Sequence, residues 1–137
     1  MWDLVKQVKF FYFKPTGSVE ADIKTYMEKS EEIKMEFAVI VKIKQASRGK
    51  HSHQFFIVNN SKGLEDVFSF QGFVVETLVF QEYLIHQEQL YKVYSIDNKF
   101  DYSIRKSVPD SEVLEGNSYF FDNFHPNFPK DSFKKFD

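Results

Sequence analysis

The sequence predicts an α+β fold that is mostly antiparallel sheet with one or two short helices. Segments rich in β-branched and aromatic residues recur along the 137 residues, which is typical of strands. One long stretch near the N-terminus instead spaces its apolar residues as a helix does. A hydrophobic fraction of 42% is enough for the core of one domain.

The chain is expected to begin with a strand over Val8–Lys14 and a helix over Ser18–Ile33. A turn cluster with proline and glycine separates the two segments. Glu20 and Asp22 favour the N-terminal end of the helix, where acidic side chains meet the positive end of the helix dipole. The elements expected next are a buried strand over Phe37–Lys44, a basic loop over 45–52, a strand over His53–Asn59, a short helix over Leu64–Phe70, and a strand over Phe73–Tyr83 that is irregular near Glu76.

A hairpin is expected where Leu90–Ile96 and Lys99–Arg105 flank the dipeptide Asp97-Asn98. A two-residue turn pairs residue 96 with 99 and residue 92 with 103. This register divides the side chains into a polar and an apolar face. The polar face then holds Lys92, Asp101, Ser103 and Arg105, and the apolar face holds Tyr91, Val93, Phe100, Tyr102 and Ile104.

The last segment, residues 118–137, has six phenylalanines and two prolines without a period. We expect no regular element there, and interpret it as a segment whose packing partner is absent. The predicted division is an N-terminal strand and helix over 1–36, a central region over 37–117, and a phenylalanine-rich tail over 118–137.

Charge distribution favours a small anionic ligand. The net charge is −2, which gives no indication of nucleic acid binding, but no acidic residue lies between Glu36 and Glu65. That window contains Lys42, Lys44, Arg48, Lys50, His51, His53 and Lys62. Without cysteine, disulfides, a thiol nucleophile and a cysteine-ligated zinc site are excluded. No apolar run has the ~20 residues of a membrane span, and a cytoplasmic location is expected.

Individual residues leave alternatives open. Lys42 precedes a glycine-containing basic loop, an arrangement that can cradle phosphate, although the P-loop spacing is absent. The alternative is an edge-strand lysine whose stem covers apolar surface. His53 lies two residues from His51, and contact with an anion or a plain surface position is favoured over a metal site. Gln81 is equally consistent with a strand end, and Lys92 with an ordinary exposed strand lysine.

The collinear order of these segments resembles the inositol 1,3,4-trisphosphate 5/6-kinases, also called inositol-tetrakisphosphate 1-kinases, which have the ATP-grasp fold. The quoted segments are VIVKIK, ASRGKHSH, Gly63-Leu64, QEYLIHQEQLYKVY and Arg105-Lys106-Ser107. The resemblance covers about Phe37–Ser107 and is most specific in QEYLIHQEQLYKVY. It implies an ATP-grasp-like central portion and phosphoryl transfer from ATP, with Mg²⁺, to a hydroxyl of an inositol polyphosphate.

The resemblance also implies roles for single residues. Lys42 matches a lysine at the ATP phosphates, and Arg105 and Ser107 match positions beside the nucleotide. The linker that holds adenine corresponds to Gln81, Glu82, Tyr83 and Leu84. On the substrate side, His53 and Lys92 match residues at the inositol phosphate.

The sequence departs from the family pattern at several points. Ala46-Ser47-Arg48-Gly49 replaces a family loop that carries a substrate-contacting histidine, and Asp97 replaces a hairpin glycine. The family's magnesium ligands, an Asp and an Asp-x-Asn motif, have no counterpart after Phe121. We therefore assign no catalytic residue and no metal ligand, and expect an incomplete fold whose metal ligands lie in a missing C-terminal part. A monomer that is inactive alone is expected; the alternative is a non-catalytic anion-binding or interaction module derived from the same fold.

Overall fold

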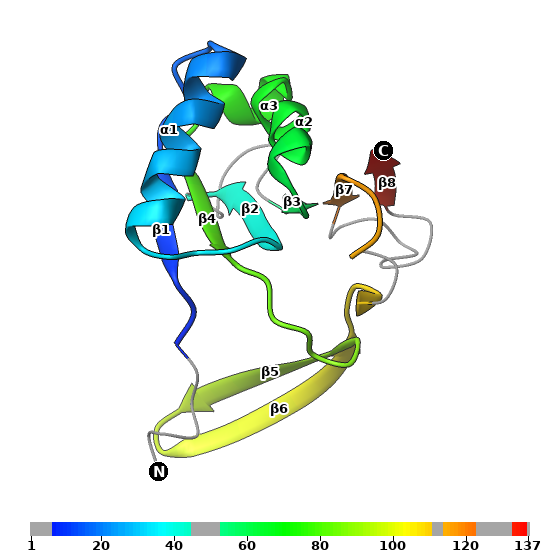
Figure 1. Cartoon of the computed structure of the whole chain (residues 1–137). Helices are drawn as coiled ribbons and strands as arrows, with labels where there is room; N and C mark the ends of the chain where they lie inside the picture. Colours follow the sequence, from blue (N-terminus) through cyan, green and yellow to red (C-terminus); the bar gives the residue numbers. More distant parts are fainter. Residues whose placement is uncertain (1–6, 45–52, 111–113, 123–132, 137) are drawn as a thin grey trace.

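The computed structural model describes residues 7–44, 53–110, 114–122 and 133–136, and shows an α+β arrangement that is mostly antiparallel sheet (Figure 1). Six strands form the main sheet in the order β1-β4-β2-β3-β7-β8, and two more form a separate hairpin. The strands are β1 Phe10–Phe13, β2 Val39–Ile43, β3 Gln54–Val58, β4 Leu78–Glu82, β5 Gln89–Ile96, β6 Lys99–Lys106, β7 Ser118–Asp122 and β8 Phe133–Phe136. The helices are α1 Val19–Glu32, the 3₁₀ turn η2 Ser61–Gly63, α2 Leu64–Phe68 and α3 Gln71–Val74. The predicted fold class is confirmed.

Helix α1 begins where the sequence predicts it. The Ser18 side chain accepts a hydrogen bond from the backbone N–H of Ala21, and so satisfies one of the amides that a helix start leaves unpaired. Buried Asp22 accepts hydrogen bonds from both the N–H and the hydroxyl of Thr16, which fixes the turn that leads into the helix. The strand and helix predicted at the start of the chain are therefore confirmed.

The helices cover one face of the main sheet, as Figure 1 shows. Successive residues of a strand point to opposite faces, and Val39, Val41 and Ile43 of β2 point to the helix side, where they are buried. Tyr26 of α1 packs there against Phe80 of β4, with ring centroids 4.7 Å apart. This is the larger of two hydrophobic clusters.

The opposite face of the main sheet, here called the far face, carries Ile40, Lys42 and Phe55. A second cluster packs on it and contains Ile57, Tyr83, Val108, Tyr119 and Phe121, with Ala38, Ile40 and Phe55 at its margin. Both faces of the central strands are therefore packed, and the chain after the hairpin returns to the far face through Val108.

Two predictions about secondary structure are wrong. The strand expected over Phe73–Tyr83 begins only at Leu78, because Gln71–Val74 forms the helix α3. There Phe73 is fully buried and packs edge-on against Phe56, 5.4 Å between ring centroids, so tertiary contact prevails over the strand preference of an apolar run.

The tail also contains regular structure, contrary to expectation. Strand β7 pairs with β3 over its whole length, and Phe121 and Ser118 are fully buried. The Ser118 hydroxyl donates to Asp66 of α2 over 2.7 Å. The described parts of this segment, residues 118–122 and 133–136, thus have partners within the chain itself. The proposed division into three regions stays a prediction.

The hairpin register is confirmed. Ile96 pairs with Lys99 and Lys92 with Ser103. Asp97 and Asn98 both have positive φ, 48° and 65°, which is the backbone of a type I′ turn. The division into faces is less clean than expected, because the face of Lys92 also carries Leu90, Tyr94 and Ile96.

The strand predicted over His53–Asn59 and the short helix over Leu64–Phe70 are present as β3 and α2. The loop expected over 45–52, with His51, lies outside the described residues. Among the described residues, no helix is both long and apolar enough to cross a membrane.

Candidate functional site

A pocket of about 270 Å³ lies between the far face, the end of β4 and the base of the hairpin. Its apolar lining comes from the sheet, from residues just outside β1 and β4, from the hairpin and from the segment that follows the hairpin: Val8, Ile40, Phe55, Leu84, Leu90 and Val108. The polar or charged lining residues are Gln81, Glu82, Tyr83, His86, Gln89 and Ser107. Two apolar walls with a few polar groups at the edge suit a flat heterocycle, because such a ring needs stacking surface and few hydrogen bonds.

The segment that joins β4 to β5, here called the linker, comprises residues 83–88. The sheet fixes where it starts, because the N–H of Tyr83 donates to the carbonyl of Ala38 over 3.0 Å. Just before it, the N–H of Glu82 donates to the carbonyl of Lys9 over 3.0 Å. The backbone of the linker is therefore held by strand-type hydrogen bonds beside the pocket.

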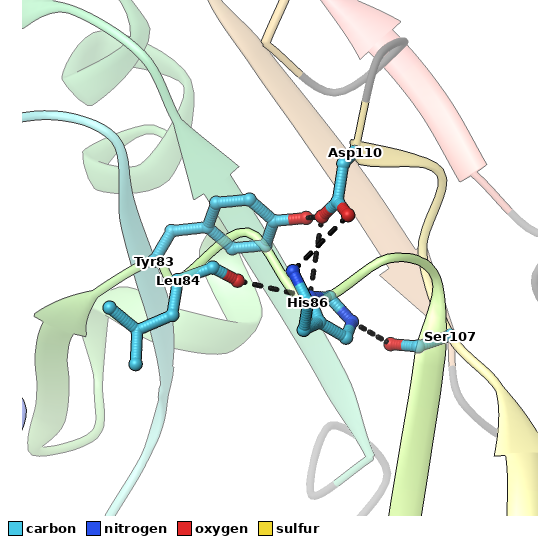
Figure 2. Close-up of polar contacts among 5 residues, drawn as sticks. All are labelled: Tyr83, Leu84, His86, Ser107 and Asp110. Carbon is cyan, nitrogen blue, oxygen red and sulfur yellow. Dashed lines mark hydrogen bonds and ion pairs between the residues drawn. The ribbon is translucent and has the colours of Figure 1, made fainter. Parts of the chain in front are cut away.

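A polar network ties the linker to the end of the hairpin (Figure 2). The His86 ring lies 3.0 Å from the Leu84 carbonyl through Nδ1 and 2.6 Å from the Ser107 hydroxyl through Nε2. Asp110 accepts a hydrogen bond from the Tyr83 hydroxyl and another from the backbone N–H of His86, the latter over 3.2 Å. All five residues belong to two short segments that flank the pocket.

The network perturbs two ionisable groups. Burial raises the pKa of Tyr83 well above its usual range, and the hydrogen bond to Asp110 and the negative charge of Asp110 raise it further. The Tyr83 hydroxyl therefore keeps its proton. Burial alone would raise the pKa of Asp110, but the hydrogen bond from Tyr83, the charge of His86 and nearby backbone amides together lower it. Asp110 is therefore a carboxylate at neutral pH.

Lys42 points from the far face at the centre of the sheet. Its strand β2 has β4 on one side and β3 on the other, so the interpretation as an edge-strand lysine is wrong. Lys42 is exposed and shares its face with Ile40, which lines the pocket two residues away. Lys44 lies two residues after Lys42 on the same face, and its ammonium is 4.4 Å from the ring centroid of Tyr12. A line of positive charge therefore leads away from the pocket.

The hairpin brings two further predicted residues to the same region. Leu90 lines the pocket, and Arg105 is its direct cross-strand partner. Lys92 is half-buried, lies two residues beyond Leu90 on the same face, and pairs with Ser103. Arg105 thus stands beside the pocket, and Lys92 one step farther along the hairpin.

The structure therefore unites much of the predicted nucleotide site but not all of it. Five of the seven residues line one pocket: Gln81, Glu82, Tyr83, Leu84 and Ser107. Lys42 and Arg105 flank the pocket without lining it. His53, half-buried and directly before β3, is not in its lining either.

Two residues that organise the site, His86 and Asp110, have no role that the sequence predicts. His86 stands within the segment QEYLIHQEQLYKVY, and Asp110 lies outside all the segments that carry the resemblance. They are 24 residues apart, and the 3.3 Å contact between His86 Nδ1 and Asp110 forms only because the hairpin folds back on the linker. No local spacing could have indicated that contact.

A second hollow, about 380 Å³, lies at the other edge of the linker. It is lined by charged groups such as Lys9, Lys34 and Glu36, along with Phe37 and the linker itself. It offers little apolar surface for a ring system. The pocket on the far face is therefore the better candidate for a nucleobase.

The described residues give no cage for a divalent metal. Within residues 7–44, 53–110, 114–122 and 133–136, no group of three or more His, Asp or Glu side chains could hold a metal ion. No site for the magnesium of ATP-dependent phosphoryl transfer can therefore be assigned among the described residues.

An antiparallel sheet with a lysine at its centre and a pocket at its linker is compatible with an ATP-grasp domain, a class of nucleotide-binding domain. A comparison with protein families supports this class: the model for the inositol 1,3,4-trisphosphate 5/6-kinase ATP-grasp domain matches residues 14–128. The chain belongs to the inositol 1,3,4-trisphosphate 5/6-kinase ATP-grasp family. This is a kinase family, and its ATP-grasp kinases generally use ATP and Mg²⁺. No curated protein matches the chain.

Proposed function

We propose that this chain binds ATP in the far-face pocket and contributes to phosphoryl transfer from ATP to a hydroxyl of an inositol polyphosphate. One observation carries the proposal. Residues that the resemblance assigned to the nucleotide, far apart in sequence, gather at one pocket: residues 81–84, from the end of β4 and the start of the linker, and Ser107 from after the hairpin. Family membership supplies the reaction class.

The proposed orientation of ATP follows from the shape of the far face. A pocket of about 270 Å³ falls just below the range of ~300–1,000 Å³ that holds whole drug-sized ligands, so it suits the base rather than the entire nucleotide. Two residues along a strand advance about 6.6 Å, so Lys42 lies about that far from Ile40 at the pocket floor. The base then lies over Ile40 and the phosphates extend toward Lys42.

The residues would act by binding and orientation. Phosphoryl transfer depends mostly on positioning and on positive charge around the transferred group. Lys42 would hold the phosphate end of ATP, and Arg105 would close the pocket from the hairpin. Lys92 and His53 would hold the substrate phosphates, as the resemblance implies.

A thermal-shift titration tests the proposal. A ligand that binds only the folded chain raises the unfolding midpoint, by about 2.7 kcal/mol of stabilisation at a concentration one hundred times its Kd. ATP should raise the midpoint, and inositol hexakisphosphate should do so independently, because the two occupy different sites. Tripolyphosphate at equal charge and ionic strength is the control for polyanion binding without a base.

The titration also separates the alternatives. If tripolyphosphate shifts the midpoint as much as ATP, the chain is an anion-binding module and the proposed nucleotide site is wrong. If neither ATP nor inositol hexakisphosphate shifts it at millimolar concentration, the chain acts as an interaction module. In that case the proposed function fails altogether.

A further inference from the structure

His86 is the centre of the polar network beside the pocket, and the proposed function does not use it. Its ring lies between the carbonyl of Leu84 and the hydroxyl of Ser107, two residues that line the pocket (Figure 2). The side chain is about one-quarter exposed. A histidine with both ring nitrogens engaged is held in one orientation, so the protons on its ring can be assigned from its partners.

The partners of Nδ1 determine the tautomer. Nδ1 lies 3.0 Å from the Leu84 carbonyl and 3.3 Å from an Asp110 oxygen, and Asp110 is ionised. Both groups only accept hydrogen bonds, so Nδ1 must carry a proton. In the neutral ring Nε2 is then an acceptor, and at 2.6 Å it receives the hydroxyl proton of Ser107.

Asp110 and Tyr83 keep the ring in this state. The carboxylate of Asp110 accepts from the Tyr83 hydroxyl at the start of the linker and from the His86 backbone N–H. At the other end of the linker, the Ser107 N–H donates to the Glu88 carbonyl over 2.9 Å. The linker and the end of the hairpin are thus joined at three places, and His86 has little freedom to turn.

The consequence concerns the hydroxyl of Ser107, a residue that lines the pocket. While His86 is neutral, that hydroxyl donates its hydrogen bond to the ring and offers only lone pairs to a ligand. When His86 is protonated, Nε2–H donates to Ser107, and the hydroxyl proton is released from the ring and can be donated to a ligand. Protonation of one ring therefore changes Ser107 from an acceptor to a donor.

We propose that His86, held by Asp110 and Tyr83, is a positioning residue that sets Ser107 to accept a hydrogen bond from the nucleoside in the pocket. The nucleoside group that would donate is an exocyclic amino group, which, unlike a ribose hydroxyl, cannot accept a hydrogen bond from Ser107 in its place. This inference rests on the proposed function, because it requires a nucleoside in the far-face pocket. It makes the affinity of that site for the nucleoside depend on pH.

The arrangement of Ser107, His86 and Asp110 also resembles the triad of serine hydrolases. Such enzymes need backbone N–H groups directed at the reacting oxygen, and one of them commonly belongs to the nucleophile itself. Here the Ser107 N–H is already donated to Glu88. The geometry therefore points to positioning rather than to nucleophilic attack.

The test uses adenosine and the full chain. Adenosine, unlike ATP, does not change charge between about pH 8 and pH 5, the range in which histidines titrate. Binding is measured by NMR titration across that range. We expect wild-type affinity to fall about five-fold as the pH is lowered, the value of one neutral hydrogen bond. The titratable groups nearest the ring, which must be followed in the same series, are Asp110, Tyr83 and Glu88.

Three variants make the test specific. Ser107→Ala should bind adenosine more weakly at high pH and show no pH dependence. His86→Gln can accept from Ser107 through its amide oxygen at every pH, and should keep the affinity while losing the pH dependence. His86→Ala should lose both. Circular dichroism and the unfolding midpoint of each variant establish that the chain is folded.

The outcomes are distinguishable. If wild-type chain binds no adenosine at pH 8, the proposed function fails with this inference. If it binds with a flat pH profile, or if His86→Gln retains the wild-type profile, only the role of His86 is refuted. Nitrogen chemical shifts of the ring that show a proton on Nε2 in the neutral state would refute the tautomer assignment. Hydrolysis of an activated ester that depends on Ser107 and His86 would contradict the positioning role in favour of a nucleophile.

Discussion

Replacing Lys42 by methionine separates binding of the phosphates from binding of the base. Methionine keeps an unbranched stem over the far face and removes only the charge. No carboxylate of the described residues pairs with Lys42, so its charge is free for a ligand. A charge-assisted hydrogen bond contributes about 1.5–3 kcal/mol, and the exposure of Lys42 favours the lower end. Because 1.4 kcal/mol corresponds to ten-fold in Kd, ATP should bind about ten-fold more weakly.

The assay is isothermal titration with ATP and with adenosine at fixed ionic strength. Adenosine has no phosphates, so its affinity should be unchanged in Lys42→Met. Lys24→Met is the matched control: Lys24 is exposed on α1, which covers the other face of the sheet, and methionine is well tolerated in helices. Equal loss for ATP and adenosine, or equal loss of ATP binding in Lys24→Met, would refute the proposed orientation of the nucleotide.

Three further predictions concern the scaffold of the site. Gly63→Ala should lower the unfolding midpoint, at a cost of about 1–3 kcal/mol, because the added Cβ would overlap the Asn117 carbonyl; a midpoint equal to wild type would contradict that packing. Phe121→Ala should cost about 3–5 kcal/mol in denaturant unfolding, since Phe121 is fully buried, whereas Phe100→Ala, 76% exposed on the hairpin, should cost little. The lowered pKa of Asp110 stabilises the fold above the ordinary value of 3.8, and this contribution is lost as the pH falls below it. In an acid titration, the Asp110→Asn variant should therefore not show this loss of stability. If the stability of the variant depends on pH as that of the wild type does, Asp110 makes no such contribution.

The parts of the fold that the sequence predicted are those decided by local chemistry. Asp97 and Asn98 favour a two-residue turn, and that turn alone determines which residues of β5 and β6 face each other. Ser18 and the acidic residues after it likewise mark the start of α1. Lys42 could be singled out because it interrupts an apolar strand, although only the structure shows that this strand is central.

The parts that were missed depend on contacts between distant segments. In the sequence, Phe73 and Phe121 belong to apolar segments without a clear period. Their conformation depends on the residues they pack against, Phe56 for Phe73 and Phe55 for Phe121. The pairing of His86 with Asp110 is of the same kind, because it exists only after the hairpin has folded back. A single sequence carries no sign of such pairs.

Mapping adenosine binding with backbone amide NMR shows whether the base of ATP lies in the pocket beside the linker. The largest shifts on adding adenosine are expected at Leu84, His86, Ser107 and Val108, which line that pocket. Amides of α1, on the other side of the sheet, should not move. Shifts centred on Lys34 and Glu36, at the other edge of the linker, or no shifts at millimolar adenosine, would contradict this position of the base.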